Sequence, residues 1–250
     1  MRYAMKNYFV ALAFTALFLP VACACGTPEP ARSGDGDPLP GNPGAKSYKN
    51  PVFREFLVAD PTVIRAEDGN FYLYATESGK NNIPILRSSD LVNWTKVGEV
   101  FTAENHPQIT DKAGANLWAP DINKIGDRYV LYYSQPGENN KHAIGVASGP
   151  SPVGPFTDHG KLIGSDEIGV DISIDQFYIE EDGYKYMFWG SFRGIWAIEL
   201  ADDGLSLKPG AGKRKIAGDQ YEGTYIHKRD GYYYLIVSPG DFMKDYHCLL

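Results

Sequence analysis

Hydrophobic and aromatic residues gather in short runs along the chain, each introduced by a turn that contains glycine. Runs of this length, rich in aromatic and β-branched residues and bounded by Gly and Asp, predict β-strands. Further strand-and-turn segments lie between them, and no long helical periodicity intervenes. The predicted fold class is therefore all-β. Four runs share the pattern: DGNFYLYAT (68–76), GDRYVLYYS (126–134), DGYKYMFWGS (182–191) and DGYYYLIVS (230–238).

The four runs recur at a nearly constant period. Their turn glycines Gly69, Gly126, Gly183 and Gly231 are 57, 57 and 48 residues apart. A period of about 50 residues built from short strands indicates a β-propeller, in which each repeat forms one four-stranded blade. The sequence thus predicts a propeller domain over residues 51–250 with about four blades.

A short strand-like segment precedes each run and carries an acidic residue near its start. If these segments are the innermost strands of the blades, their starts face one mouth of the central channel. Carboxylates crowded there cannot all stay ionised, because like charges and desolvation both favour the protonated form. The acids are Asp60 in ADPTVI, Asp121 in APDINKI, Asp175 in SIDQFYI and Glu222 in YEGTYI, 10 to 13 residues before the aligned Leu or Met of each run.

Three kinds of chemistry fit such a cluster. A protonated acid and a carboxylate that face each other across a sugar are the pair that glycoside hydrolysis needs. The same acids can instead form a Ca²⁺ cage or cap turns through backbone N–H groups. They can also bind a sugar without any reaction. The spacing alone leaves these alternatives open.

The N-terminal segment differs in composition from the rest of the chain. Residues 1–25 combine a basic start, an apolar run too short to span a bilayer and small residues, which predicts an export signal. Cys23 and Cys25 resemble the lipid-accepting cysteine of bacterial lipoproteins, although Pro20 or Ala22 stands where such signals usually have Leu. A lipoprotein is the first expectation and plain secretion the alternative. Residues 26–50, rich in Gly and Pro, are expected to form a flexible linker.

Charge and cysteine content narrow the class of partner. The formal net charge is -7 and the pI about 5.2, which disfavours nucleic acid and anionic lipid because both need clustered Lys and Arg. We expect contact with a membrane only through an N-terminal lipid anchor. Cys248 has no second cysteine in the predicted domain, so no disulfide framework is expected.

Five motifs in order resemble glycoside hydrolase family 43, whose members are inverting enzymes on a five-bladed propeller. The resemblance runs from about residue 55 to 240, and five motifs in sequence make it specific. It implies a fifth blade that residues 51–250 do not supply, so the domain is expected to be incomplete at its C-terminal end and poorly stable alone. The motifs are ADPTVI, LWAPDI (117–122), SIDQFYIEEDG (173–183), FWGSF (188–192) and YEGTYIHKRDGYYYL (221–235).

The resemblance implies roles for three acids in the hydrolysis of arabinosyl or xylosyl linkages of plant polysaccharides such as arabinan or arabinoxylan. Asp60 would be the general base, Glu222 the general acid, and Asp175 the residue that raises the pKa of Glu222 and orients it. Inversion then predicts that the Asp60 and Glu222 carboxyl groups lie about 6.5 to 9.5 Å apart. The EGT sequence at 222–224 replaces the commoner EGP of the family and leaves the carboxylate in place.

Other positions are expected to contact the substrate or support the site. Ser191, Phe192 and Arg193 lie where the family contacts substrate, and FWGSFRGIW resembles the arabinan-cleaving members in particular. Trp118 is predicted either to stack on a sugar or to pack between blades. Asp121 departs in spacing, so a structural role is favoured for it. The polar loop 102–110 is expected to form a wall of the cleft.

No cofactor is expected, and no metal-ligating residue is assigned. A structural Ca²⁺ is compatible with the family, with ligands expected mostly beyond residue 250. A non-catalytic carbohydrate-binding propeller of a surface glycan-uptake system is the alternative function. A retaining fructan-cleaving propeller is less favoured, because VADPTV lacks both asparagines of the Asn-Asp-Pro-Asn element that such enzymes carry. Endo or exo action depends on loop lengths and is not predicted.

Overall fold

Four antiparallel sheets follow one another along residues 48–249, the part of the chain that the computed structural model describes. Three sheets are four-stranded meanders in which neighbours in sequence are neighbours in the sheet, and the fourth is a two-stranded hairpin. This architecture confirms the all-β fold class and the four predicted blades. The predicted export signal (1–25) and nearly all of the predicted linker (26–50) lie outside the described residues.

The strands of each blade are as follows. Blade 1 contains β1 (Thr62–Arg65), β2 (Phe71–Tyr74), β3 (Pro84–Ser88) and β4 (Thr95–Glu99); blade 2 contains β5 (Trp118–Ile125), β6 (Arg128–Gln135), β7 (Ala143–Gly149) and β8 (Thr157–Gly164); blade 3 contains β9 (Phe177–Glu181), β10 (Tyr184–Trp189), β11 (Ile195–Leu200) and β12 (Arg214–Ala217); blade 4 contains β13 (Tyr221–Arg229) and β14 (Tyr232–Pro239). A 3₁₀ turn (Glu138–Asn140) and the four-residue helix α1 (Ser165–Ile168) complete the described elements.

The glycines that mark the repeats form the first hairpin turn of each blade. In blades 3 and 4 the turn has two residues, Asp182-Gly183 and Asp230-Gly231, and all four have positive φ. Such a turn matches the right-handed twist of the flanking strands, and Asp and Gly tolerate the left-handed conformation that it needs. These turns fix which residue of β10 pairs with which residue of β9, and likewise for β14 and β13.

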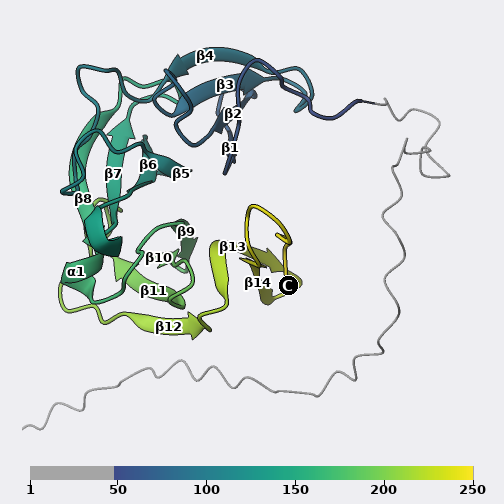
Figure 1. Cartoon of the computed structure of the whole chain (residues 1–250). Helices are drawn as coiled ribbons and strands as arrows, with labels where there is room; N and C mark the ends of the chain where they lie inside the picture. Colours follow the sequence, from purple (N-terminus) through teal and green to yellow (C-terminus); the bar gives the residue numbers. More distant parts are fainter. Residues whose placement is uncertain (1–47, 250) are drawn as a thin grey trace, which may run out of the picture. The chain divides into compact units, whose positions relative to one another are not determined.

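The first strand of each blade lies on the inner side of the blade arrangement. Figure 1 shows β1, β5, β9 and β13 inside and β4, β8 and β12 outside. Consecutive inner strands are in contact, β1 with β5, β5 with β9 and β9 with β13. The starts of these strands therefore gather at one place although they are far apart in the sequence.

Two hydrophobic clusters join the first three blades, and β6 supplies residues to both. Because side chains alternate along a strand, Leu131 and Tyr133 pack toward blade 1 while Val130 and Tyr132 pack toward blade 3. The buried tyrosines keep their hydroxyl groups bonded: Tyr132 donates to the Gly204 carbonyl at 2.8 Å. Aromatic residues of the first three repeats thus fill part of the space between neighbouring blades.

The apolar residues around Asp60 do not all pack into blade 1. Ile64 packs against the cluster between blades 1 and 2, as the alternation predicts. Leu57 and Val63 are exposed, at 70% and 45%, which the sequence did not predict. Val63 faces away from Ile64 because adjacent strand residues point to opposite sides. Among residues 48–249, no helix has the length and apolar character needed to cross a membrane.

Candidate active site

Each inner strand is entered through one residue with left-handed backbone conformation. Strand pairing aligns Val63, Ile122, Tyr178 and Ile226 with the Leu or Met at the centre of each second strand. The residue three positions earlier has positive φ in all four blades. These residues are Asp60 (49°), Ala119 (42°), Asp175 (59°) and Gly223 (63°).

This alignment corrects the predicted set of equivalent acids. Asp60 and Asp175 are equivalent, but Ala119 occupies the position in blade 2 and Asp121 lies two residues later. In blade 4 the position is Gly223, so Glu222 precedes it by one. Both offsets coincide with register shifts, between Trp118 and Asp121 in β5 and between Glu222 and Tyr225 in β13. Spacing in the sequence cannot reveal such bulges.

Three of the predicted acids meet across blade boundaries. The backbone N–H of Gly223 donates to Asp175 Oδ2 at 3.3 Å, which joins the entrances of blades 3 and 4. The negative charges of Glu222 and Asp60 both act on the Asp175 carboxyl group. Asp60 itself is exposed, whereas Asp175 and Glu222 are half-buried. The carboxyl groups of Asp60, Asp175 and Glu222 therefore form one electrostatically coupled cluster.

Crowding in this cluster favours the protonated form of Asp175. Burial, followed by the charge of Glu222 and then that of Asp60, raises the pKa of Asp175 to about 7. The Gly223 N–H opposes this shift because it stabilises the carboxylate. The role that the resemblance implies for Asp175, as the residue that tunes and orients Glu222, stays a prediction.

Asp121 lies in the interior and connects blade 2 to blade 3. Its Oδ2 accepts the Tyr178 backbone N–H at 2.7 Å and the Asn123 side-chain amide at 3.0 Å. Burial raises the pKa of Asp121 to about 7. These contacts link two blades and support the structural role favoured for Asp121.

The four predicted substrate contacts lie in different surroundings. Trp118 begins β5, is half-buried and packs edge-on against His142, with ring centroids 6.1 Å apart. Ser191 is 4% exposed, and its hydroxyl donates to Glu222 Oε2 at 2.7 Å. Phe192 is half-buried and Arg193 exposed in the connection from β10 to β11. Ser191 thus contacts the predicted acid itself, and whether these residues bind a sugar stays a prediction.

Sequence reasoning missed Tyr246, which follows β14. Burial, together with the charges of Glu222 and Asp175, raises the pKa of its hydroxyl to about 12, while Ser238 acts in the opposite direction. Tyr246 therefore lies beside the carboxyl cluster and remains protonated at physiological pH. It stands outside the four repeated runs, so no signal in the repeat pattern marks it.

The buried side chain of Gln135 holds the loop that leads into β5. Gln135 Oε1 accepts the Ile109 and Thr110 N–H groups at 2.7 and 3.2 Å, and Nε2 donates to the Pro107 and Ala115 carbonyls at 2.8 and 3.2 Å. All four bonds of the amide are made, with no exposure to solvent. The loop predicted to form a cleft wall is therefore a fixed part of the structure.

A second contact fixes the loop next to the entrance of blade 1. Glu77 Oε2 accepts from His106 at 2.9 Å and from the Leu117 N–H at 2.9 Å. Glu77 directly follows Thr76, whose hydroxyl bonds to Asp60. The position of the loop is thus linked to the segment after β2, whose Thr76 hydroxyl bonds to the predicted base Asp60.

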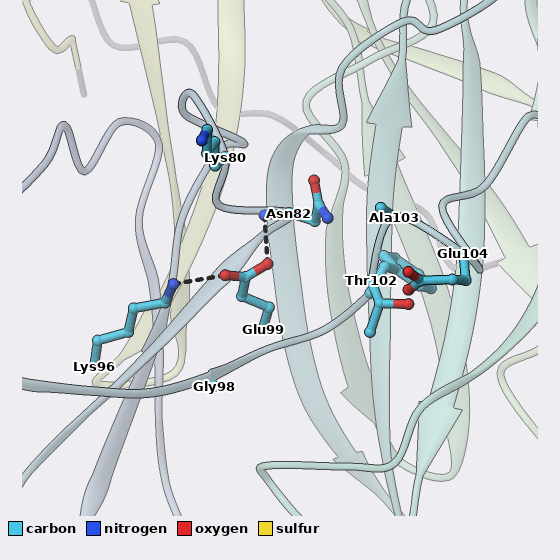
Figure 2. A pocket seen from close by; sticks show the side chains of 9 residues that line it. Lys80, Asn82, Lys96, Gly98, Glu99, Thr102, Ala103 and Glu104 are labelled. Atoms are coloured by element: carbon cyan, nitrogen blue, oxygen red, sulfur yellow. Dashed lines mark hydrogen bonds and ion pairs between the residues drawn. The ribbon is translucent and has the colours of Figure 1, made fainter.

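An open hollow of about 440 Å³ lies elsewhere, between β4 and the chain that follows it. Figure 2 shows that its carboxylate Glu99 is engaged by Lys96 and by the Asn82 N–H, at 2.6 and 3.1 Å. The hollow is lined from the outer strand rather than from the inner strand starts. Its Glu99 carboxylate is paired within the protein, and we assign the hollow no role.

Metal-binding residues were not assigned from the sequence. Within residues 48–249, no group of three or more His, Cys, Asp or Glu side chains is placed to hold a metal ion. The described residues therefore give no observation for the structural Ca²⁺ that the family resemblance allows, and that ion stays a prediction.

Fold and site together define a propeller protein in which carboxylates from three blades meet at the inner strand starts. The family model of glycosyl hydrolases family 43 matches residues 48–250. The chain belongs to this family, which confirms the family suggested by the ordered motifs.

The most similar proteins found include two arabinan-degrading enzymes. The chain is 34% identical over 194 residues to the extracellular endo-alpha-(1->5)-L-arabinanase 1 of Bacillus subtilis, covering 73% of this chain and 59% of that protein. It is 34% identical over 187 residues to arabinan endo-1,5-alpha-L-arabinosidase C of Emericella nidulans, covering 70% and 56%. The chain thus spans less than two thirds of the length of these relatives.

Solved structures of arabinanases share the fold. The GH43 endo-arabinanase from Bacillus licheniformis matches with a TM-score of 0.66 at 28% identity, covering 78% of this chain and 71% of that one. A native arabinanase of Bacillus subtilis matches with a TM-score of 0.63 at 30% identity, covering 74% and 66%. These matches agree with the propeller type predicted from the repeats.

Proposed function

We propose that the protein is an inverting glycoside hydrolase that cleaves arabinosyl linkages in arabinan. The observation that carries this proposal is the coupling of Asp60, Asp175 and Glu222, which come from three separate blades. Membership of family 43 and the names of the relatives, which act on 1,5-linked arabinan, support the substrate class.

In the proposed reaction the carboxyl groups act from opposite sides of the sugar. Glu222 donates a proton to the glycosidic oxygen as the bond to the anomeric carbon breaks. Asp60 removes a proton from the water that attacks the opposite face of that carbon. Asp175 orients Glu222, and repulsion among the three crowded carboxyl groups keeps a proton within the cluster. The product carries the inverted configuration, and both carboxyl groups regain their starting protonation through solvent.

The test compares isosteric variants that remove each carboxyl function. Turnover of linear 1,5-arabinan is measured by the release of reducing ends. We expect Asp60→Asn and Glu222→Gln each to lower kcat by about 10²- to 10⁴-fold, the contribution typical of general acid or base catalysis. Asp127→Asn, at an exposed carboxylate in the hairpin between β5 and β6, is the matched control and should leave kcat unchanged.

Two outcomes would contradict the proposal. Glu222→Gln that retains wild-type turnover would show that this residue is not the acid. A wild-type protein that binds arabinan, with an affinity unchanged in Glu222→Gln, and releases no reducing ends would instead identify a carbohydrate-binding propeller.

Export is proposed with the function, because the Bacillus subtilis relative is named as extracellular. The finer expectation is a lipid anchor on Cys23 or Cys25. Radiolabelled palmitate should enter the wild-type chain in a bacterial host, and one of the variants Cys23→Ala and Cys25→Ala should lose the label. A chain that is exported without any label is a plainly secreted protein.

A further inference from the structure

A hydroxyl residue ends the second-strand run of every repeat. The four are Thr76, Ser134, Ser191 and Ser238. Each follows its strand or lies in its last residues, close to where the inner strands begin. The hydrophobic pattern does not require a hydroxyl there, and neither does the turn chemistry. Because a hydroxyl residue recurs at this position in all four blades, we expect a contact that the blades share.

In three blades the hydroxyl bonds to the entrance of an inner strand. Ser134 accepts the Asp175 backbone N–H at 3.1 Å and donates to the Gln176 side chain at 2.7 Å. Ser191 donates to Glu222 Oε2 at 2.7 Å. Thr76 donates to Asp60 Oδ2 at 2.6 Å. Each of the three acids of the cluster thus has one of these hydroxyls as a partner, through its backbone or its carboxyl group.

The Thr76 contact has a defined direction. Its oxygen also accepts the Ala119 backbone N–H at 2.8 Å. A hydroxyl carries one proton, and an oxygen that accepts from an N–H turns that proton toward its other partner. Asp60 Oδ2 must then be the acceptor. The hydrogen bond consequently fixes the rotation of the Asp60 carboxyl group.

The remaining oxygen of Asp60 has a different environment. Within residues 48–249, no hydrogen-bond donor to Asp60 Oδ1 is present, and the residue is exposed. A general base needs one oxygen free to take the proton of water while the group as a whole is held still. The Thr76 hydroxyl and the exposed Oδ1 together meet that requirement.

We propose that Thr76 is a positioning residue for Asp60: it holds Oδ2 through its hydroxyl so that Oδ1 faces the attacking water. This inference rests on the proposed function, in which Asp60 is the general base. Thr76 itself touches neither water nor sugar in the reaction. The Ala119 N–H, which belongs to the next blade, sets the direction of the Thr76 hydroxyl.

The test removes the hydroxyl while retaining the volume of the side chain. Thr76→Val is compared with Thr76→Ser, which keeps the hydroxyl, on linear 1,5-arabino-oligosaccharides. We expect Thr76→Val to lower kcat by about 10- to 100-fold, the range that corresponds to a hydrogen bond to a charged group. KM should stay within about twofold of the wild type, since Thr76 does not bind the sugar. Thr76→Ser should keep kcat within about threefold.

Two further variants control for folding and for substitution in a strand. Thr76→Ala also lacks the hydroxyl and serves if Thr76→Val does not fold. Thr95→Val makes the same change at an exposed position of the outer strand β4 and should behave as the wild type. Thr76→Val and Thr76→Ala with kcat within twofold of the wild type would overturn the inference. So would Thr76→Ser with a loss as large as that of Thr76→Val.

A spectroscopic readout separates this inference from the proposed function. The ¹³C resonance of the Asp60 carboxyl carbon, assigned with Asp60→Asn, should move in Thr76→Val and return in Thr76→Ser. If the wild type does not hydrolyse arabinan, the proposed function fails, and this resonance still decides whether Thr76 holds Asp60. An Asp60 resonance that is the same in all three proteins would refute the contact.

Discussion

Asp175 shows most clearly how one side chain responds to its position at the strand starts. The residue enters β9 in left-handed conformation, a conformation that most L-residues avoid but Asp tolerates. This geometry places its carboxyl group beside Glu222 and Asp60 rather than along the strand. The energetic cost of that crowding should be measurable as a dependence of stability on pH.

We predict that stability falls as pH rises from about 4 to about 7. The folded-state pKa of Asp175, about 7, lies above the ordinary aspartate value of 3.8, so within this window the folded state holds a proton that the unfolded state has lost. The free energy of unfolding therefore decreases with pH, and the decrease ends above the folded-state pKa. Urea unfolding at pH 5, 6, 7 and 8 measures it.

Burial also raises the pKa of Asp121 to about 7, so Asp121 contributes to the decrease in stability between pH 4 and 7. Asp175→Asn should therefore remove part of the slope, and Asp175→Asn combined with Asp121→Asn should remove more. Asp127→Asn, at an exposed carboxylate, should leave the slope as it is. A wild-type stability that rises through this window would contradict the raised pKa values.

The identities of the acids could be predicted from sequence, and their exact geometry could not. Asp60 and Asp175 precede short apolar strands in matching contexts, so the repeat alone marks them. The replacement of Asp121 by Ala119 at the equivalent position depends on a bulge in β5. Tyr246 depends on the path of the chain after β14. The bulge in β5 and the position of Tyr246 both depend on how distant segments pack, and local sequence patterns do not reveal this.

At the level of elements, Gln135 links a strand to the loop that follows blade 1. We predict that Gln135→Leu costs about 2 to 4 kcal/mol, because it leaves two N–H groups and two carbonyls of the loop without partners. Limited proteolysis should cut within residues 102–117 sooner than in the wild type. Urea unfolding measures the cost.

The matched control for this change is Gln220→Leu, at an exposed glutamine between β12 and β13. It should change the free energy of unfolding by less than about 0.5 kcal/mol, as surface substitutions usually do. A Gln135→Leu protein with wild-type stability and wild-type protection of the loop would show that the four hydrogen bonds contribute little.

Element prediction succeeded where the local signal was strong. The Asp-Gly turns and aromatic runs located β10 and β14 because turn chemistry and strand propensity act together there. Packing faces were harder to predict. Val63 has the same apolar character as Ile64, and only the placement of blade 2 on one side of β1 decides that Ile64 is covered and Val63 exposed.

At the scale of the whole described unit, function depends on a repeat that brings distant residues together. Asp60 and Glu222 are 162 residues apart in sequence, yet both charges act on Asp175. This is possible because consecutive inner strands are in contact, so that each blade places the start of its first strand beside that of the next. The same arrangement lets the hydroxyls of Ser134 and Ser191, at the ends of second strands, contact the acidic residue at the entrance of the next blade.

The stereochemistry of the first product tests this account most directly. A short 1,5-linked α-L-arabino-oligosaccharide is incubated with the full chain, and the anomeric proton signals are followed by NMR before mutarotation is complete. Water activated by Asp60 on the face opposite to Glu222 predicts a first-formed β-anomer. A first-formed α-anomer would mean retention through a covalent intermediate and would contradict the assignment of Asp60 as a base.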